Sequence, residues 1–143
     1  MHIEKDTAEI TPAAIEHLIK YATEAHPLEA CGLLVSSGIG DPIDEIVPIR
    51  NSSKQAHHRF AFDPQDWVQA YFNAQKNQRH LVGFFHSHPM GAPVPSPTDY
   101  AGLPPAFAGI YCIVSVCTHP PQIQMYRGQA GELHPLMLAE VSV

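Results

Sequence analysis

The chain has 143 residues, of which 45% are hydrophobic and 15% charged, and its formal net charge is -6. This length and apolar content are typical of one compact domain, so we expect a single domain over residues 1–143. The negative charge and the lack of any lysine and arginine cluster argue against a nucleic acid or an anionic membrane as partner. The longest nearly apolar run, residues 106–117, is too short to span a bilayer, and the first six residues do not resemble a signal peptide. We therefore expect a cytoplasmic protein.

The first half of the chain predicts a helix followed by strands. Thr11-Pro12 is typical of a helix start, because threonine caps free backbone N–H groups and proline suits the first helical position. Ala14, Leu18 and Ala22 then recur at the spacing of a helix face that packs on a core. Strands are expected near residues 31–36, 44–50 and 58–62.

The middle of the chain predicts a second helix and then a buried strand at residues 81–86. Asp63-Pro64 again combines a capping side chain with proline, and Trp67, Ala70 and Tyr71 share one face that we expect to join the core. Further on, we expect a short helix after Ser96 and strands at 110–116, 122–127 and 132–138. Because helices and strands do not alternate strictly, the prediction is an α/β fold with a mixed, curved β-sheet flanked by helices.

The buried strand runs directly into His86-Ser87-His88. A strand projects every second side chain to the same face, so His86 and His88 point together as two neighbouring metal ligands would. Catalytic zinc takes three protein ligands and leaves one position open, and Asp99 can supply the third ligand. A His-x-His pair alone is weak evidence in a chain with 10 histidines, since random placement gives roughly 0.6 such pairs. Requiring Ser96 and Asp99 at their spacing lowers that expectation to roughly 0.0015.

Each member of this set also has a plainer interpretation. Ser96-Pro97-Thr98-Asp99 is typical of a helix start, with Ser96 as the cap and Asp99 near the positive end of the helix dipole. That interpretation is compatible with metal binding, because a fixed helix start would hold Asp99 in place. The alternative for His86 and His88 is a pair of strand-end histidines that are hydrogen-bonded to backbone.

Glu29 stands immediately before the apolar run 31–35, so we expect its carboxylate to be partly desolvated. A hydrolytic zinc site needs a base that takes a proton from water and an acid that passes it to the leaving amine. One carboxylate with a raised pKa can do both in turn, which makes Glu29 the candidate. The alternative is a solvated acid in the turn after the first helix.

Together, Glu29, His86-Ser87-His88-Pro89 and Ser96-Pro97-Thr98-Asp99 resemble the JAMM/MPN+ metalloproteases, whose pattern is Glu, then His-x-His, then Ser-x-x-Asp. The segment 27–34 is similar to the one in which small prokaryotic members carry their catalytic Glu. The resemblance covers nearly the whole chain and implies the MPN fold, with its cytidine-deaminase-like architecture. It also implies zinc (Zn²⁺) bound by His86, His88 and Asp99, general acid/base action by Glu29, and an oxyanion-side hydrogen bond from Ser96.

The resemblance further implies a substrate class. Family members act on the carboxyl-terminal tail of ubiquitin-like or ThiS-like sulfur-carrier proteins and cleave after a terminal Gly-Gly. The short spacing from Pro89 to Ser96 leaves no room for one of the inserted segments with which larger members grip ubiquitin, so the chain looks like the compact prokaryotic type. We expect the site to be walled by residues 90–95 and 59–62. Two alternatives stay open: a non-catalytic scaffold of the same fold, and a zinc hydrolase of another amide bond, such as one in peptidoglycan.

Three features remain outside this pattern. Cys31, Cys112 and Cys117 lack metal-ligand spacing, so we expect three buried thiols. The prolines between residues 89 and 97 restrict the loop and would keep ligands from different elements in register, although an ordinary coil rich in turn residues is the alternative. The other eight histidines have no partner pattern, and we expect them to be surface or structural residues.

Overall fold

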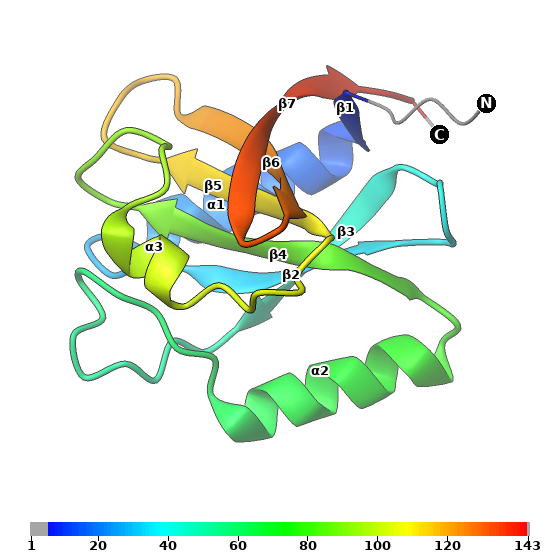
Figure 1. Cartoon of the computed structure of the whole chain (residues 1–143), viewed down its shortest axis with the longest axis horizontal. Coiled ribbons are helices and arrows are strands. Elements are labelled where there is room, and N and C mark those ends of the chain that lie inside the picture. The colour runs from blue at the N-terminus through cyan, green and yellow to red at the C-terminus, as the bar shows by residue number, and fades with distance from the viewer. Residues whose placement is uncertain (1–5, 143) are drawn as a thin grey trace.

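The structure is a computed structural model that describes residues 6–142. Its strands are β1 (Thr7–Ile10), β2 (Cys31–Ser36), β3 (Ile43–Ile49), β4 (His80–His88), β5 (Ile110–Ser115), β6 (Gln122–Gln129) and β7 (Glu132–Glu140). Its helices are α1 (Pro12–Ala25), α2 (Pro64–Lys76) and α3 (Pro97–Ala101). The strands pair in the order β1-β3-β2-β4-β5-β6-β7 and close into a barrel (Figure 1).

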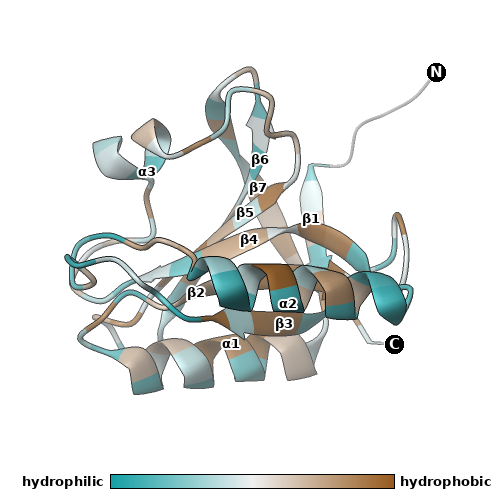
Figure 2. Ribbon diagram, turned by 90° about the horizontal axis from the view of Figure 1, so that it is seen from below, coloured by the Kyte–Doolittle hydropathy of each residue, from teal (hydrophilic) through white to brown (hydrophobic). Residues whose placement is uncertain are grey.

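The sheet is mixed and curved, as the sequence predicts. β4 runs parallel to β5, and β1 runs parallel to both β3 and β7, whereas the other neighbouring strands are antiparallel. Figure 2 shows α1 and α2 running alongside the largely hydrophobic β3. The sheet is more curved than the sequence predicts. It closes into a barrel because β1 pairs with β3 on one side and with β7 on the other.

Helix α1 forms where the sequence predicts it. The Thr11 side chain accepts a hydrogen bond from the backbone N–H of Ala14 at 3.2 Å, and Pro12 occupies the first helical turn. Ala14, Leu18 and Ala22 are buried and join the main apolar core between the helix and the barrel. Burial of this stripe, rather than helix propensity, holds the helix against the sheet.

Helix α2 packs more loosely. Its cap is Asp63, which accepts a hydrogen bond from the backbone N–H of Asp66 at 3.1 Å. Ala70 is buried, and Trp67 is half-buried against a second apolar cluster. Tyr71 remains 39% exposed, so the expectation that it joins the core is wrong. Its ring lies against the outer side of Trp67, with ring centroids 5.7 Å apart, and Trp67 takes the inner position.

The expected strand at 58–62 is also wrong, because this segment makes a single bridge between Asn51 and Phe62. The Asn51 side chain takes up the neighbouring backbone groups: its amide donates to the carbonyl of Arg59 at 3.0 Å, and its oxygen accepts from the N–H of Ala61 at 3.1 Å. The alternating aromatic residues therefore give this segment the sequence pattern of a strand. Its backbone groups, however, bond to the Asn51 side chain and not to a neighbouring strand. Conversely, β1 was not expected, since four residues carry too little pattern to indicate a strand.

The cysteines differ in burial. Cys31 and Cys112 are buried, as expected, whereas Cys117 is exposed. The expectation failed for Cys117 because β5 ends at Ser115, two residues before it. No helix in the described part of the chain is long and apolar enough to cross a membrane.

Candidate metal centre and active site

Strand β4 carries both histidines to one end of the barrel. His86 and His88 lie within the strand, and their ring centroids are 4.8 Å apart. Ser87 faces the other way and is fully buried, as the period of two predicts. Its hydroxyl oxygen accepts a hydrogen bond from the backbone N–H of Ala30 at 2.7 Å. One strand therefore places the histidines and also holds the residue that follows Glu29.

The structure brings Asp99 to the two histidines. Asp99 Oδ1 lies 3.2 Å from His86 Nε2, and Asp99 Oδ2 lies 3.1 Å from His88 Nε2. The possible ligand atoms of the three residues all lie within 4.8 Å of one another. Ligand atoms at about 2.0–2.1 Å around a tetrahedral zinc are about 3.3 Å apart, and the two distances from Asp99 to the histidines match this spacing.

The buried state of His86 tests this match independently. The side chain is fully buried, and neither ring nitrogen has a hydrogen-bond partner among the described residues. Its Nε2 faces Asp99 at close range without the geometry of a hydrogen bond. A buried nitrogen without a partner is costly, and a cation between His86 and Asp99 would remove that cost. The residues present therefore fit a metal ion.

Short-range hydrogen bonds hold the other two candidate ligands. His88 Nδ1 pairs with the carbonyl of Ala92 at 2.7 Å, which leaves Nε2 directed at Asp99. Ser96 and Asp99 form a capping box at the start of α3: the Ser96 hydroxyl accepts from the Asp99 N–H at 3.1 Å, and the Asp99 carboxylate accepts from the Ser96 N–H at 2.8 Å. The helix cap is therefore present, and it holds the Asp99 carboxylate where it faces both histidines.

The protonation states of His86 and Asp99 suit metal binding. Burial lowers the pKa of His86 despite the nearby Asp99, so the ring stays neutral. Burial alone would raise the pKa of Asp99, but its contacts with His86, His88 and the Ser96 N–H hold that pKa well below its usual range. Burial also acts to lower the pKa of His88, yet Asp99 and the Ala92 carbonyl raise it overall. Asp99 is therefore ionised over the whole physiological range.

Glu29 lies at the edge of β2 and is only 7% exposed. Burial raises its pKa to about 7; the His88 charge opposes this shift, and the Asp99 charge adds to it. The Oε1 atom of Glu29 is buried and has no hydrogen-bond partner among the described residues. The backbone on both sides is fixed, because its N–H donates to the Ala56 carbonyl at 2.7 Å and its carbonyl accepts from Asn51 at 2.9 Å. Glu29 is a carboxyl poised to exchange a proton near neutral pH.

The proline-rich loop 90–95 is tied to the barrel by hydrogen bonds. The Ser115 hydroxyl donates to the Gly91 carbonyl, and the Tyr126 hydroxyl donates to the Pro93 carbonyl at 2.6 Å. With the His88 contact to Ala92, these bonds fix the loop between the candidate ligands. The loop is therefore held by specific partners, and proline content alone does not account for its position.

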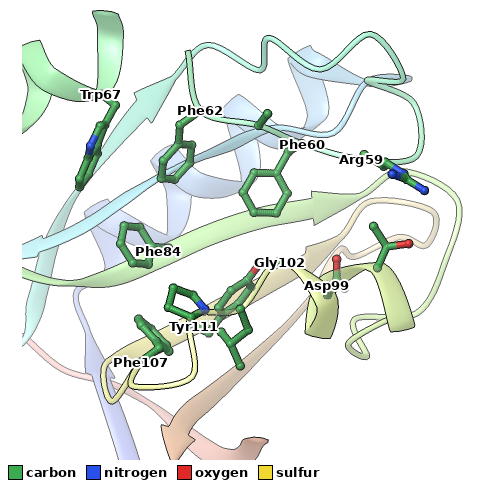
Figure 3. Close-up of a pocket in the computed structure, with 13 residues that line it drawn as sticks. Arg59, Phe60, Phe62, Trp67, Phe84, Asp99, Gly102, Phe107 and Tyr111 are labelled. Atoms are coloured by element: carbon green, nitrogen blue, oxygen red, sulfur yellow. The ribbon is translucent and has the colours of Figure 1, made fainter. Parts of the chain in front are cut away.

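Two aromatic rings contact His86: Phe60 comes from the expected wall 59–62, whereas Tyr111 has no role in the sequence analysis. Phe60 stacks on it with centroids 4.7 Å apart, and Tyr111 meets it edge-on at 5.4 Å. A cavity of about 350 Å³ opens beside these rings. Figure 3 shows Asp99 at one end of this cavity and Trp67 at the other. The alternation of Phe60 and Phe62 predicts a strand, but these two residues line the cavity from an irregular segment.

Comparison with known families places this site in context. A family model described as prokaryotic homologs of the JAB domain matches residues 11–128, which include every predicted site residue. The chain belongs to this family. The JAMM/MPN+ resemblance stated from the sequence is thereby confirmed.

This JAB-domain chain is similar to one curated protein in sequence and to solved structures in fold. A curated protein named desampylase, from Haloferax volcanii, is 28% identical over 92 residues, which are 64% of this chain and 66% of that relative, slightly less than two thirds of its length. A protein from Desulfitobacterium hafniense, known from a solution structure, is 26% identical and superposes with a TM-score of 0.83 over 95% of this chain and 94% of its own. A JAB1/MPN domain protein from Archaeoglobus fulgidus is 22% identical, with a TM-score of 0.59 over 93% and 98% of the two chains, and shows the fold alone.

Proposed function

We propose that this protein is a zinc-dependent metallopeptidase or isopeptidase that cleaves after the carboxyl-terminal Gly-Gly of a ubiquitin-like or ThiS-like sulfur-carrier protein. The observation that carries the proposal is the convergence of His86, His88 and Asp99, together with a buried Glu29 whose pKa is raised to about 7. Three ligands and one nearby acid/base group are the parts that hydrolytic zinc sites use. The relative named desampylase supports an activity on ubiquitin-like proteins.

In this proposal His86 Nε2, His88 Nε2 and Asp99 hold the zinc. Bound zinc would act as a Lewis acid on the scissile carbonyl and lower the pKa of water. Glu29 takes the proton of the attacking water and then passes it to the departing amine, because its pKa of about 7 makes both transfers accessible near neutral pH.

Ser96 has a second role in this proposal besides its cap. The Ser96 hydroxyl oxygen accepts from the Asp99 N–H, which leaves its proton for the developing oxyanion of the substrate.

The decisive experiment combines metal analysis with a cleavage assay. The zinc-loaded protein is incubated with a carrier protein that is extended beyond Gly-Gly, and the products are identified by mass spectrometry. Glu29→Gln should keep stoichiometric zinc and lose roughly 100-fold or more in turnover, since the base is gone but the ligands stay. His88→Ala should lose the zinc as well, as native mass spectrometry would show.

Other outcomes separate the alternatives. Zinc binding without cleavage of any extended carrier would favour the non-catalytic scaffold. Cleavage of a peptidoglycan fragment, and not of a carrier, would favour a hydrolase of another amide. A Glu29→Gln protein with the parental rate would remove Glu29 from the mechanism.

A further inference from the structure

The cavity beside His86 is more apolar than a metal site requires. Aromatic and aliphatic side chains form most of its wall, and Asp99 reaches it at one end. Its volume of about 350 Å³ falls within the range of small-ligand pockets, roughly 300–1,000 Å³, whereas well-packed cores leave few voids larger than a water molecule. The side chains that carry the argument below are Phe60, Phe62, Trp67, Leu103 and Tyr111.

Tyr111 points to a ligand in this cavity. Its side chain is only 6% exposed and lines the cavity, and its hydroxyl has no hydrogen-bond partner among the described residues. Tyr126, equally buried in the same apolar cluster, donates its hydroxyl to the Pro93 carbonyl. The Tyr111 hydroxyl is not one of the fully buried polar atoms of the described residues, so it is open to a group that enters the cavity from outside.

The distance of the cavity from the candidate metal ligands indicates which residue of the substrate would lie in it. The ring centroid of Phe60 lies 4.7 Å from that of His86, and the centroid of Phe62 lies 5.7 Å from that of Phe60. An extended peptide rises about 3.3 Å per residue, so these rings lie about two to three residues away from the metal ligands. In a tail that ends in Gly-Gly, the first side chain at that distance belongs to the residue before the two glycines.

The side of the cut follows from Glu29. Glu29 gives its proton to the leaving amine, and it is not among the residues that line this cavity, whereas Asp99 is. The cavity therefore belongs to the acyl half of the substrate, the carrier tail, and not to the group that departs.

We propose that the cavity is a specificity pocket that binds one large apolar side chain of the carrier tail, at the residue immediately before Gly-Gly, while the Tyr111 hydroxyl hydrogen-bonds the tail backbone. This inference rests on the proposed function for the direction of the tail. Most of the wall is aromatic or aliphatic, so burial of a large apolar side chain there is favourable, whereas Arg59 and Asp99 supply its charged groups.

A binding experiment tests the pocket without requiring cleavage. Trp67 is the single tryptophan of the chain and lines the cavity, so its emission reports occupancy. The zinc-loaded protein is titrated with the acetylated peptides Thr-Leu-Gly-Gly and Thr-Ser-Gly-Gly, which mimic the cleaved tail. The leucine peptide should shift the Trp67 emission and bind about tenfold more tightly than the serine peptide, as expected for burial of one leucine side chain.

Two variants and one control sharpen the test. Leu103→Phe fills part of the cavity and should remove most of the preference for leucine. Val68→Phe adds the same ring on α2 at a site that is 48% exposed and outside the cavity, and should keep the preference. Tyr111→Phe should weaken both peptides about threefold to tenfold without lowering Tm, because the hydroxyl has no partner within the protein.

The two proposals fail in different ways. Equal affinity for the leucine and serine peptides, with no change in Trp67 emission, would overturn the pocket even if carriers are cleaved. A clear preference for leucine, together with no cleavage of any extended carrier, would support the pocket and reject the hydrolase. A Tyr111→Phe protein with unchanged affinity for both peptides would overturn the role of the hydroxyl.

Discussion

Ser87 links the two halves of the candidate site. It lies between His86 and His88, and its buried hydroxyl accepts from the N–H of Ala30, the residue after Glu29. The Ser87 N–H in turn donates to the Ala30 carbonyl at 2.9 Å. Movement of the acid relative to the histidines would therefore break buried hydrogen bonds, and this cost keeps the acid and the ligands in a fixed relation.

The buried carboxyl of Glu29 gives a prediction about pH. Burial raises its pKa from 4.5 to about 7, so the protonated acid contributes stability that is fully present below about 4.5 and is lost as pH rises through about 7. Glu29→Gln removes this titration. In the metal-free protein, the difference in Tm between the variant and the parent should therefore change with pH. It should shift in favour of the variant by about 5 °C as pH rises from about 5 to about 8.

The measurement is thermal unfolding with a chelator present, at several pH values. Glu24→Gln is a matched control, because Glu24 is 64% exposed and pairs with Lys20 on the surface of α1. A Tm difference between Glu29→Gln and the parent that stays constant with pH would contradict the buried, proton-exchanging state of Glu29.

At the scale of elements, α3 shows how a very short helix positions a candidate ligand. It has five residues, and its capping box joins Ser96 to Asp99 from both directions. Asp99 lies in its first turn, where free N–H groups and the helix dipole favour a carboxylate. The helix is too short to be stable alone, so the cap and the contacts with the two histidines together set the position of Asp99.

Substitution of Ser96 separates its two roles. Ser96→Ala should cost about 1 kcal/mol of unfolding free energy through the lost cap. It should also lower turnover on the order of 100-fold through the lost oxyanion donor. Ser96→Thr, which keeps a hydroxyl, is expected to recover most of both. Denaturant unfolding and the carrier cleavage assay measure the two effects, and a lowered stability with an unchanged rate would leave Ser96 as a cap only.

Some helices and strands could be predicted from the sequence, and others could not. α1, α2 and β4 were predictable because capping residues and period are local: Thr11-Pro12, Asp63-Pro64 and the run before His86 each carry their own signal. The segment 58–62 was not, because the Asn51 side chain takes the backbone bonds that a strand partner would make. In the same way, the His-x-His spacing indicated the candidate ligands, whereas the ring of Tyr111 reaches His86 only through the β4 and β5 pairing.

At the scale of the whole molecule, the pairing of β4 with β2 and β5 gathers the candidate site at one end of the sheet. β4 brings the histidines, α3 brings Asp99, and the loop before β2 brings Glu29, while residues 59–62 line the neighbouring cavity. These parts are distant in sequence, so several segments at once enclose the approach to the candidate metal centre. The expected wall at 59–62 is present as an irregular segment that lines the cavity.

This enclosure gives the last prediction, which concerns the two glycines of the substrate. Phe60 stacks on the buried His86, so a chain that reaches the metal must pass close to aromatic rings, and a side chain next to the scissile bond would clash with them. Glycine has none and allows close approach of the backbone. Replacement of the final glycine of the carrier by valine should lower kcat/KM by about tenfold or more through steric exclusion. The control is a valine placed four residues before the final glycine, on the flexible tail. This substitution should change kcat/KM little. If the enzyme cleaved the glycine and valine carriers equally, or cleaved short peptides of arbitrary sequence as well, it would be a general zinc peptidase without selection for Gly-Gly.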